Sequence, residues 1–154
     1  MGVHITSGSP SRSADAVYQH SGYARECGLP FEDHLGRIWV GGSNDVGCFD
    51  GARFYSMHDY GFPSGTGGAV AEDTAGGIWI SNSSGIYRFF HGTLQEILQG
   101  WVQGLFVAGN VVVATIGPLQ RINSTPVLVR IQQSGASWRT DRIAQLPFLE
   151  PFHG

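Results

Sequence analysis

Apolar and polar residues alternate over short runs of this chain, and clusters of turn-forming residues separate the runs. Between residues 67 and 98 the runs are GGAVAED, GIWISN, GIYRFF and TLQEIL. The residues that join them, Asp-Thr-Ala-Gly, Ser-Ser-Gly and His-Gly, favour tight turns. Alternation fits these runs better than the helical spacing i, i+3, i+4 and i+7. The pattern therefore predicts four short antiparallel strands in this segment.

The same pattern returns with a period of about forty residues. EDHLGRIWVG at 32–41 aligns with EDTAGGIWIS at 72–81, and Glu, Asp, Gly, Ile and Trp match. Four strands in each copy, with this period, are typical of a β-propeller blade. The Trp of each copy points to the face opposite its Ile and Val neighbours, so both faces of the strand are apolar. That indicates a strand held between two adjacent blades.

A third, degenerate copy starts near Leu105, where GNVVVATIGPLQRI aligns with GGIWISNSSGIYRF. The alignment places Val112 under Trp79. It also places Arg121 under Arg88. The third strand of this copy stays open at this point, because PLQRI and VLVRI both have the required pattern.

The sequence therefore predicts an all-β fold, a partial β-propeller of about three four-stranded antiparallel blades of roughly forty residues each. The expected divisions are a flexible lead-in with room for one strand at 1–24, blades at 25–67, 68–103 and 104–146, and a tail or the start of a next blade at 147–154. Closed propellers have about 4–8 blades. Three blades expose open edges, so we expect a fragment of a longer protein or a piece that self-associates.

Certain residues recur because the blade needs them. An Asp that opens a turn accepts hydrogen bonds from the backbone two residues on, and a glycine tolerates the positive φ that closes the turn. The Trp residues are expected to fill the space between blades. The structural repeat residues are Asp33, Gly36, Trp39, Asp73, Gly76, Trp79, Gly85 and Phe89.

Composition supports this class and excludes others. Charged residues make up 14% of the chain, against about 25% in typical domains, and the 23 glycines are roughly double the usual share. The 42% of hydrophobic residues are too many for a disordered chain. The net charge is −3 and no basic run occurs, so we expect no nucleic-acid binding. No stretch approaches the ~20 apolar residues of a membrane span, and no apolar signal-peptide region is present.

The phrase D-x-x-G-x-[IL]-W-[VI]-[GS], followed by a strand G-[IVL]-x-x-F, resembles the two-component regulator propeller repeat. The matching residues are Asp33, Gly36, Ile38, Trp39, Gly41, Asp73, Gly76, Ile78, Trp79, Gly85, Ile86, Arg88 and Phe89. CGLP at 27–30 also resembles the GLP that precedes such blades, and the resemblance covers roughly residues 28–125. The third copy lacks the Asp turn and the Trp.

That family builds seven-bladed propellers in the extracytoplasmic part of bacterial sensors. Hybrid histidine kinases that detect polysaccharide fragments and membrane-tethered diguanylate cyclases are among them. The resemblance implies a ligand-sensing module in the periplasm, as part of a parent receptor. It implies that any catalytic output domain lies outside this chain.

Ligands of propellers usually bind on one face, close to the central channel. Loops between the second and third strands of a blade form that face, together with the connections between blades. Aromatic rings beside amides and carboxylates suit sugars, because the rings stack on CH surface while polar groups meet the hydroxyls. The candidate ligand contacts are Asn44, Asp45, His58, Tyr60, Asn82 and Trp101. The alternative for the Asn and Asp residues is a role as turn formers, and for Trp101 it is packing at a blade junction.

Histidine and cysteine provide no recognisable site. The six histidines are scattered without the spacing of a metal site, so we expect no metal, no cofactor and no catalytic residue in this chain. Cys27 and Cys48 are either small apolar side chains or, in an oxidising compartment, a disulfide.

The leading interpretation is a ligand-sensing β-propeller module, a fragment of a bacterial signal-transduction receptor, with carbohydrate as the ligand class. Its expected partners are a small molecule or an oligosaccharide, and the remaining blades of a longer chain or a second copy. One alternative is a propeller enzyme that resembles streptogramin lyase, which needs a His and Glu pair at the channel. Another is a protein-interaction scaffold without catalysis.

Overall fold

A computed structural model describes residues 30–42, 44–66, 68–117 and 126–145. The expected lead-in at 1–24 and tail at 147–154 lie outside these residues, as do Cys27 and Arg121. In the described part of the chain, the strands form three four-stranded antiparallel sheets. The prediction of an all-β, partial β-propeller fold is confirmed, and the sheets are called blades one, two and three below.

Each blade is a meander in which consecutive strands are neighbours. Blade one contains β1 (Phe31–Glu32), β2 (Ile38–Gly41), β3 (Val46–Phe49) and β4 (Phe54–Ser56), followed by the 3-10 helix η1 (Met57–Tyr60). Blade two contains β5 (Ala69–Glu72), β6 (Ile78–Asn82), β7 (Gly85–Phe90) and β8 (Thr93–Gln99). Blade three contains β9 (Trp101–Ala108), β10 (Val111–Gly117), β11 (Val127–Ser134) and β12 (Ser137–Gln145).

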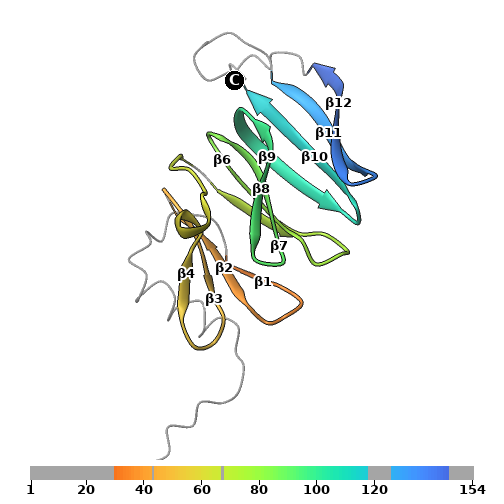
Figure 1. Cartoon of the computed structure of the whole chain (residues 1–154). Coiled ribbons are helices and arrows are strands. Elements are labelled where there is room, and N and C mark those ends of the chain that lie inside the picture. The colour runs from red at the N-terminus through yellow and green to blue at the C-terminus, as the bar shows by residue number, and fades with distance from the viewer. Residues whose placement is uncertain (1–29, 43, 67, 118–125, 146–154) are drawn as a thin grey trace, which may run out of the picture.

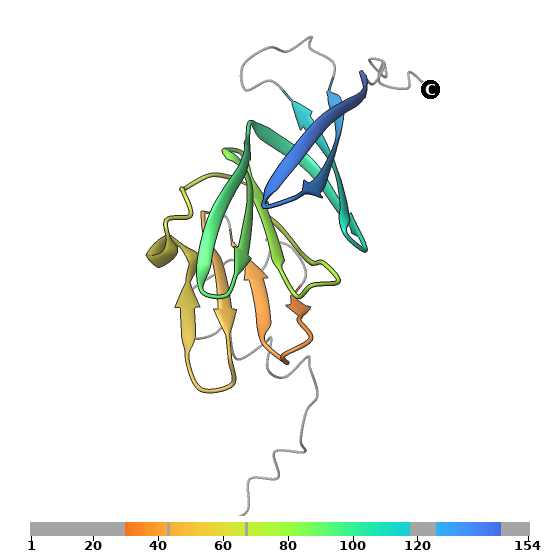
Figure 2. The same cartoon turned by 45° about the vertical axis from the view of Figure 1, so that its right-hand side comes forward.

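The blades follow one another side by side, from the orange and yellow strands through the green ones to the blue ones (Figures 1 and 2). Blade two lies in the middle, and all five residues of β6 are buried. Ile78 and Ile80 face blade one, while Trp79 faces blade three. Successive side chains of β6 therefore belong to two separate cores, one on each face of the strand. This agrees with the sequence prediction that both faces of the strand are apolar.

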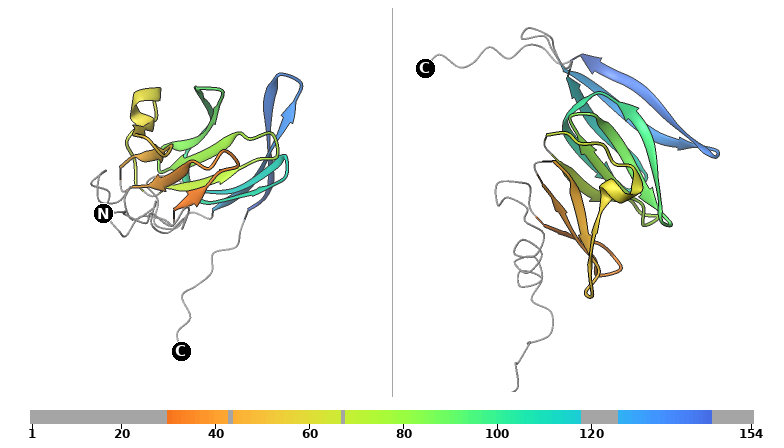
Figure 3. Two further views of the ribbon diagram at one scale, coloured as in Figure 1. Left: turned by 90° about the horizontal axis from the view of Figure 1, so that it is seen from below. Right: turned by 60° about the vertical axis from the view of Figure 1, so that its left-hand side comes forward.

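Two junctions hold these cores. At the first junction, between blades one and two, the buried apolar residues are Trp39, Val46, Cys48, Met57, Phe62, Ile78, Ile80, Tyr87 and Phe89. At the second junction, between blades two and three, they are Trp79, Ile86, Val112, Ala114, Val129 and Ile131. The helix η1 follows β4 and lies against blade two, because Met57 belongs to the first core and Tyr60 meets Phe89 (Figure 3).

Blade three resolves the ambiguity in its third strand. VLVRI forms that strand as part of β11, while PLQRI lies outside the described residues. The alignment of Val112 with Trp79 is wrong, because the two side chains meet from opposite sides of the second junction. The turn between β9 and β10 has two residues instead of the five between β5 and β6, and the side-chain alternation is offset accordingly.

Among the described residues, no helix has the length and apolar character needed to cross a membrane.

Candidate functional site

One carboxylate organises each of the first two blades. In blade two, Asp73 Oδ1 accepts hydrogen bonds from the backbone N–H groups of Ala75 (3.0 Å) and Gly77 (2.9 Å). Its Oδ2 accepts from Trp79 Nε1 and Arg88 Nε, both at 2.9 Å. The Asp therefore closes the turn and also fixes an indole and a guanidinium group.

Asp33 repeats this arrangement in blade one. Its Oδ1 accepts from the backbone N–H groups of Leu35 and Arg37, both at 2.9 Å. Its Oδ2 accepts from Trp39 Nε1 at 2.8 Å and from Arg37 Nε at 2.6 Å. Burial raises the pKa of this carboxyl, but the hydrogen bonds from Trp39 and Arg37 outweigh it and hold the pKa below its ordinary value. The same balance lowers the pKa of Asp73, where Arg88 and Trp79 supply the bonds.

The guanidinium comes from a different part of each blade, namely the turn before β2 in blade one and strand β7 in blade two. Trp79 pairs with Arg88 across β6 and β7, and the corresponding partner of Trp39 is Cys48. Conversely, Gly77 stands in blade two where blade one has Arg37. A Cβ atom on Gly77 would lie 2.3 Å from a terminal nitrogen of Arg88. An arginine in the turn and an arginine on the third strand therefore exclude each other within one blade. Each Asp and Trp pair is served by one arginine, which comes from the turn or from the third strand.

The two junctions differ in how well the arginine position is covered. At the second junction Trp138 covers Arg88, with the guanidinium carbon 5.0 Å from the ring centroid. Phe90 lies on the same guanidinium at 4.4 Å, and only 10% of the Arg88 side chain is exposed. At the first junction the short Cys48 takes the place of Arg88, and Leu94 takes the place of Trp138 as second residue of its strand.

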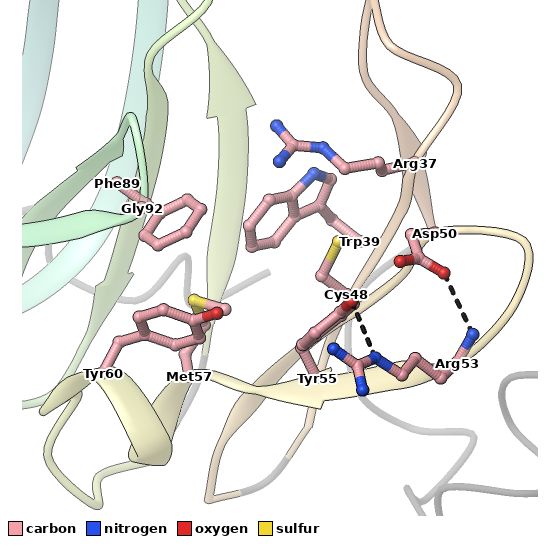
Figure 4. Close-up of a pocket in the computed structure, with 10 residues that line it drawn as sticks. All are labelled: Arg37, Trp39, Cys48, Asp50, Arg53, Tyr55, Met57, Tyr60, Phe89 and Gly92. Atoms are coloured by element: carbon pink, nitrogen blue, oxygen red, sulfur yellow. Dashed lines mark hydrogen bonds between the residues drawn. The ribbon is translucent and has the colours of Figure 1, made fainter.

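The smaller side chains leave a cleft of about 380 Å³ at the first junction (Figure 4). The residues that line it are Arg37, Trp39, Cys48, Asp50, Arg53, Tyr55, Met57, Tyr60, Phe89 and Gly92. Trp39 is fully buried, so it supports the cleft from behind. Tyr60 is 37% exposed and meets Phe89 edge to face at 5.0 Å, so its ring offers contact surface.

Charged groups form the rim of the cleft. Arg53 donates from Nε to the Tyr55 hydroxyl at 2.8 Å, and its guanidinium carbon lies 4.8 Å from the centroid of that ring. Asp50 Oδ1 accepts from the backbone N–H groups of Ala52 and Arg53, at 2.8 and 2.9 Å, and so closes the turn before β4. Of the guanidinium nitrogens of Arg37, only Nε makes a hydrogen bond to another described residue, and the guanidinium lies over the Trp39 ring at 5.4 Å. The cleft therefore combines aromatic surface with free hydrogen-bond donors.

A second depression of about 180 Å³ adjoins the cleft. Arg37, Phe89 and Gly92 line both, and His34 and His91 line the second one only. The backbone N–H of His34 donates to the Glu72 carboxylate at 3.0 Å, and His34 Nδ1 contacts the same carboxylate. This contact ties the Asp turn of blade one to blade two beside the second depression.

Cys48 is a free, buried thiol at the back of the cleft. Burial raises its pKa to about 12, and the opposing influence of Arg37 is smaller. The thiol is therefore protonated at neutral pH and lacks the thiolate character of a nucleophile.

Of the six predicted ligand contacts, Tyr60 lies in the cleft. Asp45 and His58 lie together elsewhere on blade one, with His58 Nε2 3.7 Å from Asp45 Oδ1. His58 Nδ1 donates to the Phe62 carbonyl at 2.7 Å, and the Ser56 hydroxyl donates to Asp45. These contacts hold η1 against the loop between β2 and β3.

The remaining three predicted contacts are dispersed. Asn82 is buried, donates from Nδ2 to the Pro63 carbonyl at 2.8 Å, and accepts at Oδ1 from the Ser84 N–H at 2.8 Å. Its side chain thus organises the turn between β6 and β7. Asn44 and Trp101 are exposed, in the loop after β2 and at the start of β9. Their ligand contacts stay predictions.

The expected structural residues occupy consistent positions. Gly36 and Gly76 have φ of 78° and 86°, which closes the two Asp turns. Gly85 lies so close to β8 that a Cβ would meet the Leu98 carbonyl oxygen at 2.3 Å. Phe89 joins the first core, where its ring lies 5.7 Å from that of Trp39.

Sequence reasoning missed the residues that form the rim of the cleft, namely Arg37, Asp50, Arg53 and Tyr55. The aligned repeats carried a signal for Arg37. In the alignment Arg37 corresponds to Gly77 and Cys48 corresponds to Arg88, so each blade has one arginine at these two positions. Within the described ranges, no three His, Cys, Asp or Glu side chains come together as metal ligands.

Comparison of the chain with protein-family models, with curated proteins and with solved structures finds no match.

Proposed function

We propose that this chain is a ligand-sensing part of a β-propeller and that its first junction binds a small polar molecule of the carbohydrate class. The observation that carries the proposal is the difference between the two junctions. Both are built from the same Asp, Trp and Arg contacts, yet one is covered by Trp138 and the other leaves a cleft of about 380 Å³. Ligand sites usually occupy about 300–1,000 Å³, so the cleft is large enough.

The chemistry of the cleft suits a sugar. The Tyr60 ring offers a partly exposed aromatic face on which CH groups can stack. Around it, the guanidinium of Arg37 and the hydroxyl group of Tyr60 offer polar partners for the hydroxyl groups of a sugar. The resemblance of the repeats to those of bacterial sensors supports a role in signal transduction on the extracytoplasmic side of a parent receptor.

Thermal unfolding of the 154-residue chain with a panel of neutral and acidic di- and trisaccharides tests the proposal. A ligand at ten times its Kd adds about 1.4 kcal/mol to the free energy of unfolding. For a chain of this size that raises Tm by roughly 3–5 °C. Absence of a shift with every saccharide at 10 mM would contradict the proposal.

A matched control comes from the chain itself. The double variant R37G/C48R gives blade one the residues of blade two at both positions, so the guanidinium moves to the place of Cys48 and fills part of the cleft. Its Asp33 contacts are restored while its cleft is reduced, and we expect it to fold and to lose the saccharide-dependent shift. A shift equal to that of the wild type would place binding elsewhere.

A further inference from the structure

We infer that the ligand of the first-junction cleft is an acidic sugar, whose carboxylate binds the guanidinium group of Arg37, and that it is at least a disaccharide. The inference rests on the proposed function and names the class of carbohydrate. Two cations and one carboxylate line this cleft. The carboxylate, Asp50, already accepts two backbone hydrogen bonds from its own turn.

Arg37 is the better placed of the two cations. Its Nε is held by Asp33 at 2.6 Å, so the position of the guanidinium is fixed before any ligand arrives. The two terminal nitrogens make no hydrogen bond to another described residue, the guanidinium carbon lies 5.4 Å from the centroid of the Trp39 ring, and 25% of the side chain is exposed. A guanidinium with a free donor edge binds a carboxylate in a bidentate manner. Figure 4 shows this group extending over the indole of Trp39 on the side of Phe89.

The second junction provides an internal comparison. Arg88 makes the same bond to Asp73 at 2.9 Å, but the rings of Phe90 and Trp138 enclose its guanidinium. The two arginines have equal structural roles, and the accessible donor edge of Arg37 is therefore not needed for the fold. It remains available for a ligand.

The length of the ligand follows from the position of Arg37 between the two depressions. Arg37, Phe89 and Gly92 line both the cleft of about 380 Å³ and the depression of about 180 Å³. A carboxylate at Arg37 places one sugar ring beside Tyr60 and directs the next toward His34 and His91. A single ring would leave one of the two depressions empty.

The test uses matched ligands that differ in charge alone. Digalacturonate and its dimethyl ester are titrated against the 154-residue chain by calorimetry, with lactose and citrate as further probes. We expect the acid to bind about tenfold more tightly than the ester, as is typical of charge-assisted hydrogen bonds. Equal affinity for acid and ester would overturn the inference and leave the proposed function intact. If citrate binds as tightly as digalacturonate, the site recognises negative charge without recognising the sugar, and the acidic-sugar inference is overturned.

Variants locate the effect. Arg53 is exposed and lies at another part of the rim, so R53Q removes a cation without disturbing the Asp33 contacts, and we expect it to lose about twofold in affinity for the acid, through weaker long-range attraction, but none for the ester. Arg139 on β12 is also exposed, and R139Q should leave both affinities unchanged. Equal losses for acid and ester in R53Q would overturn the role of Arg53. If no saccharide of either kind binds, the proposed function fails and this inference fails with it.

Discussion

Moving the guanidinium of blade one from residue 37 to residue 48 tests the central structural argument. Positions 37 and 48 of blade one correspond to Gly77 and Arg88 of blade two, where the third strand supplies the cation. If one Asp and Trp pair needs one guanidinium from either source, R37G and C48R should each destabilise the chain. The double variant should recover most of the loss.

The structure sets the size of each step. R37G removes the bond between Arg37 Nε and Asp33 Oδ2, while three N–H donors remain on that carboxylate. The expected loss is that of one charged hydrogen bond, about 1.5–3 kcal/mol, with a further ~0.5–1 kcal/mol for the freedom of glycine in the unfolded chain. C48R directs a second guanidinium into space that the residue 37 side chain occupies, which costs about 1–3 kcal/mol.

In the double variant the bond to Asp33 returns and the overlap is absent. Its guanidinium lacks the two ring contacts that Arg88 has, because Asp50 and Leu94 stand where blade two and blade three provide Phe90 and Trp138. Each exposed contact of that kind is worth about 0.5–1 kcal/mol. We therefore expect the double variant to lie within about 1.5 kcal/mol of the wild type, and the coupling between the substitutions to exceed about 2 kcal/mol.

Urea unfolding at pH 7, followed by tryptophan fluorescence, measures these differences. Trp39 and Trp79 are fully buried, so both report on loss of the cores. Equal m-values across the four proteins are required for the comparison. R139A, which removes an exposed ion pair with Asp141, serves as a control with an expected change below about 0.5 kcal/mol. If the double variant is no more stable than the less stable of the two single variants, the idea that either position can supply the guanidinium is refuted.

Acid, alkylation and one glycine provide further tests. Burial raises the pKa of Asp73, but the bonds from Arg88 and Trp79 lower it overall, so the stability this group adds is complete above about pH 4 and is lost as the pH falls through the folded-state pKa. Urea unfolding between pH 5 and 2.5 should show this loss, and D73N should show less of it; equal slopes would contradict the assignment. Because burial raises the pKa of Cys48 to about 12, iodoacetamide at pH 8 should label it only in unfolded protein, and rapid native labelling in a background without the other cysteine would contradict this. G77A should cost about 1–3 kcal/mol by urea unfolding, because its Cβ meets the Arg88 guanidinium, whereas G68A meets its nearest atom at 3.6 Å and should cost less; the reverse order would disprove the steric argument.

The fold could be predicted because its signals are local. Alternation and turn residues define each strand, and the repeat shows that the strands form equivalent sheets. The prediction that β6 is apolar on both faces follows from alternation alone, and the structure confirms it. The alignment of the third copy failed because a turn of two residues replaces one of five, and this changes which face each later residue occupies.

The site was harder to predict because it depends on contacts that sequence does not pair. The expected ligand residues were chosen from loops, by analogy with other propellers, and of these Tyr60 lies in the cleft. Arg37 and Arg88 occupy different columns of the aligned repeats, so nothing in the sequence shows that both reach the same carboxylate position. Only the hydrogen bonds to Asp33 and Asp73 reveal that equivalence. The role of Leu94 was hidden in the same way, since its counterpart Trp138 lies in the degenerate copy.

The two junctions show how a repeated blade can be stable and specific at the same time. The buried Asp needs a cation, and either of two positions meets that need at similar distances of 2.6 and 2.9 Å. When the cation comes from the third strand, its side chain fills the outer part of the junction and rings cover it. When the cation comes from the turn, that space stays open and the donor edge faces the solvent. The choice between the two sources thus changes what the junction can bind without changing what holds the blade together. An arginine after the turn glycine, with a small residue opposite the Trp on the third strand, is therefore the pattern that should mark open junctions in chains with this repeat.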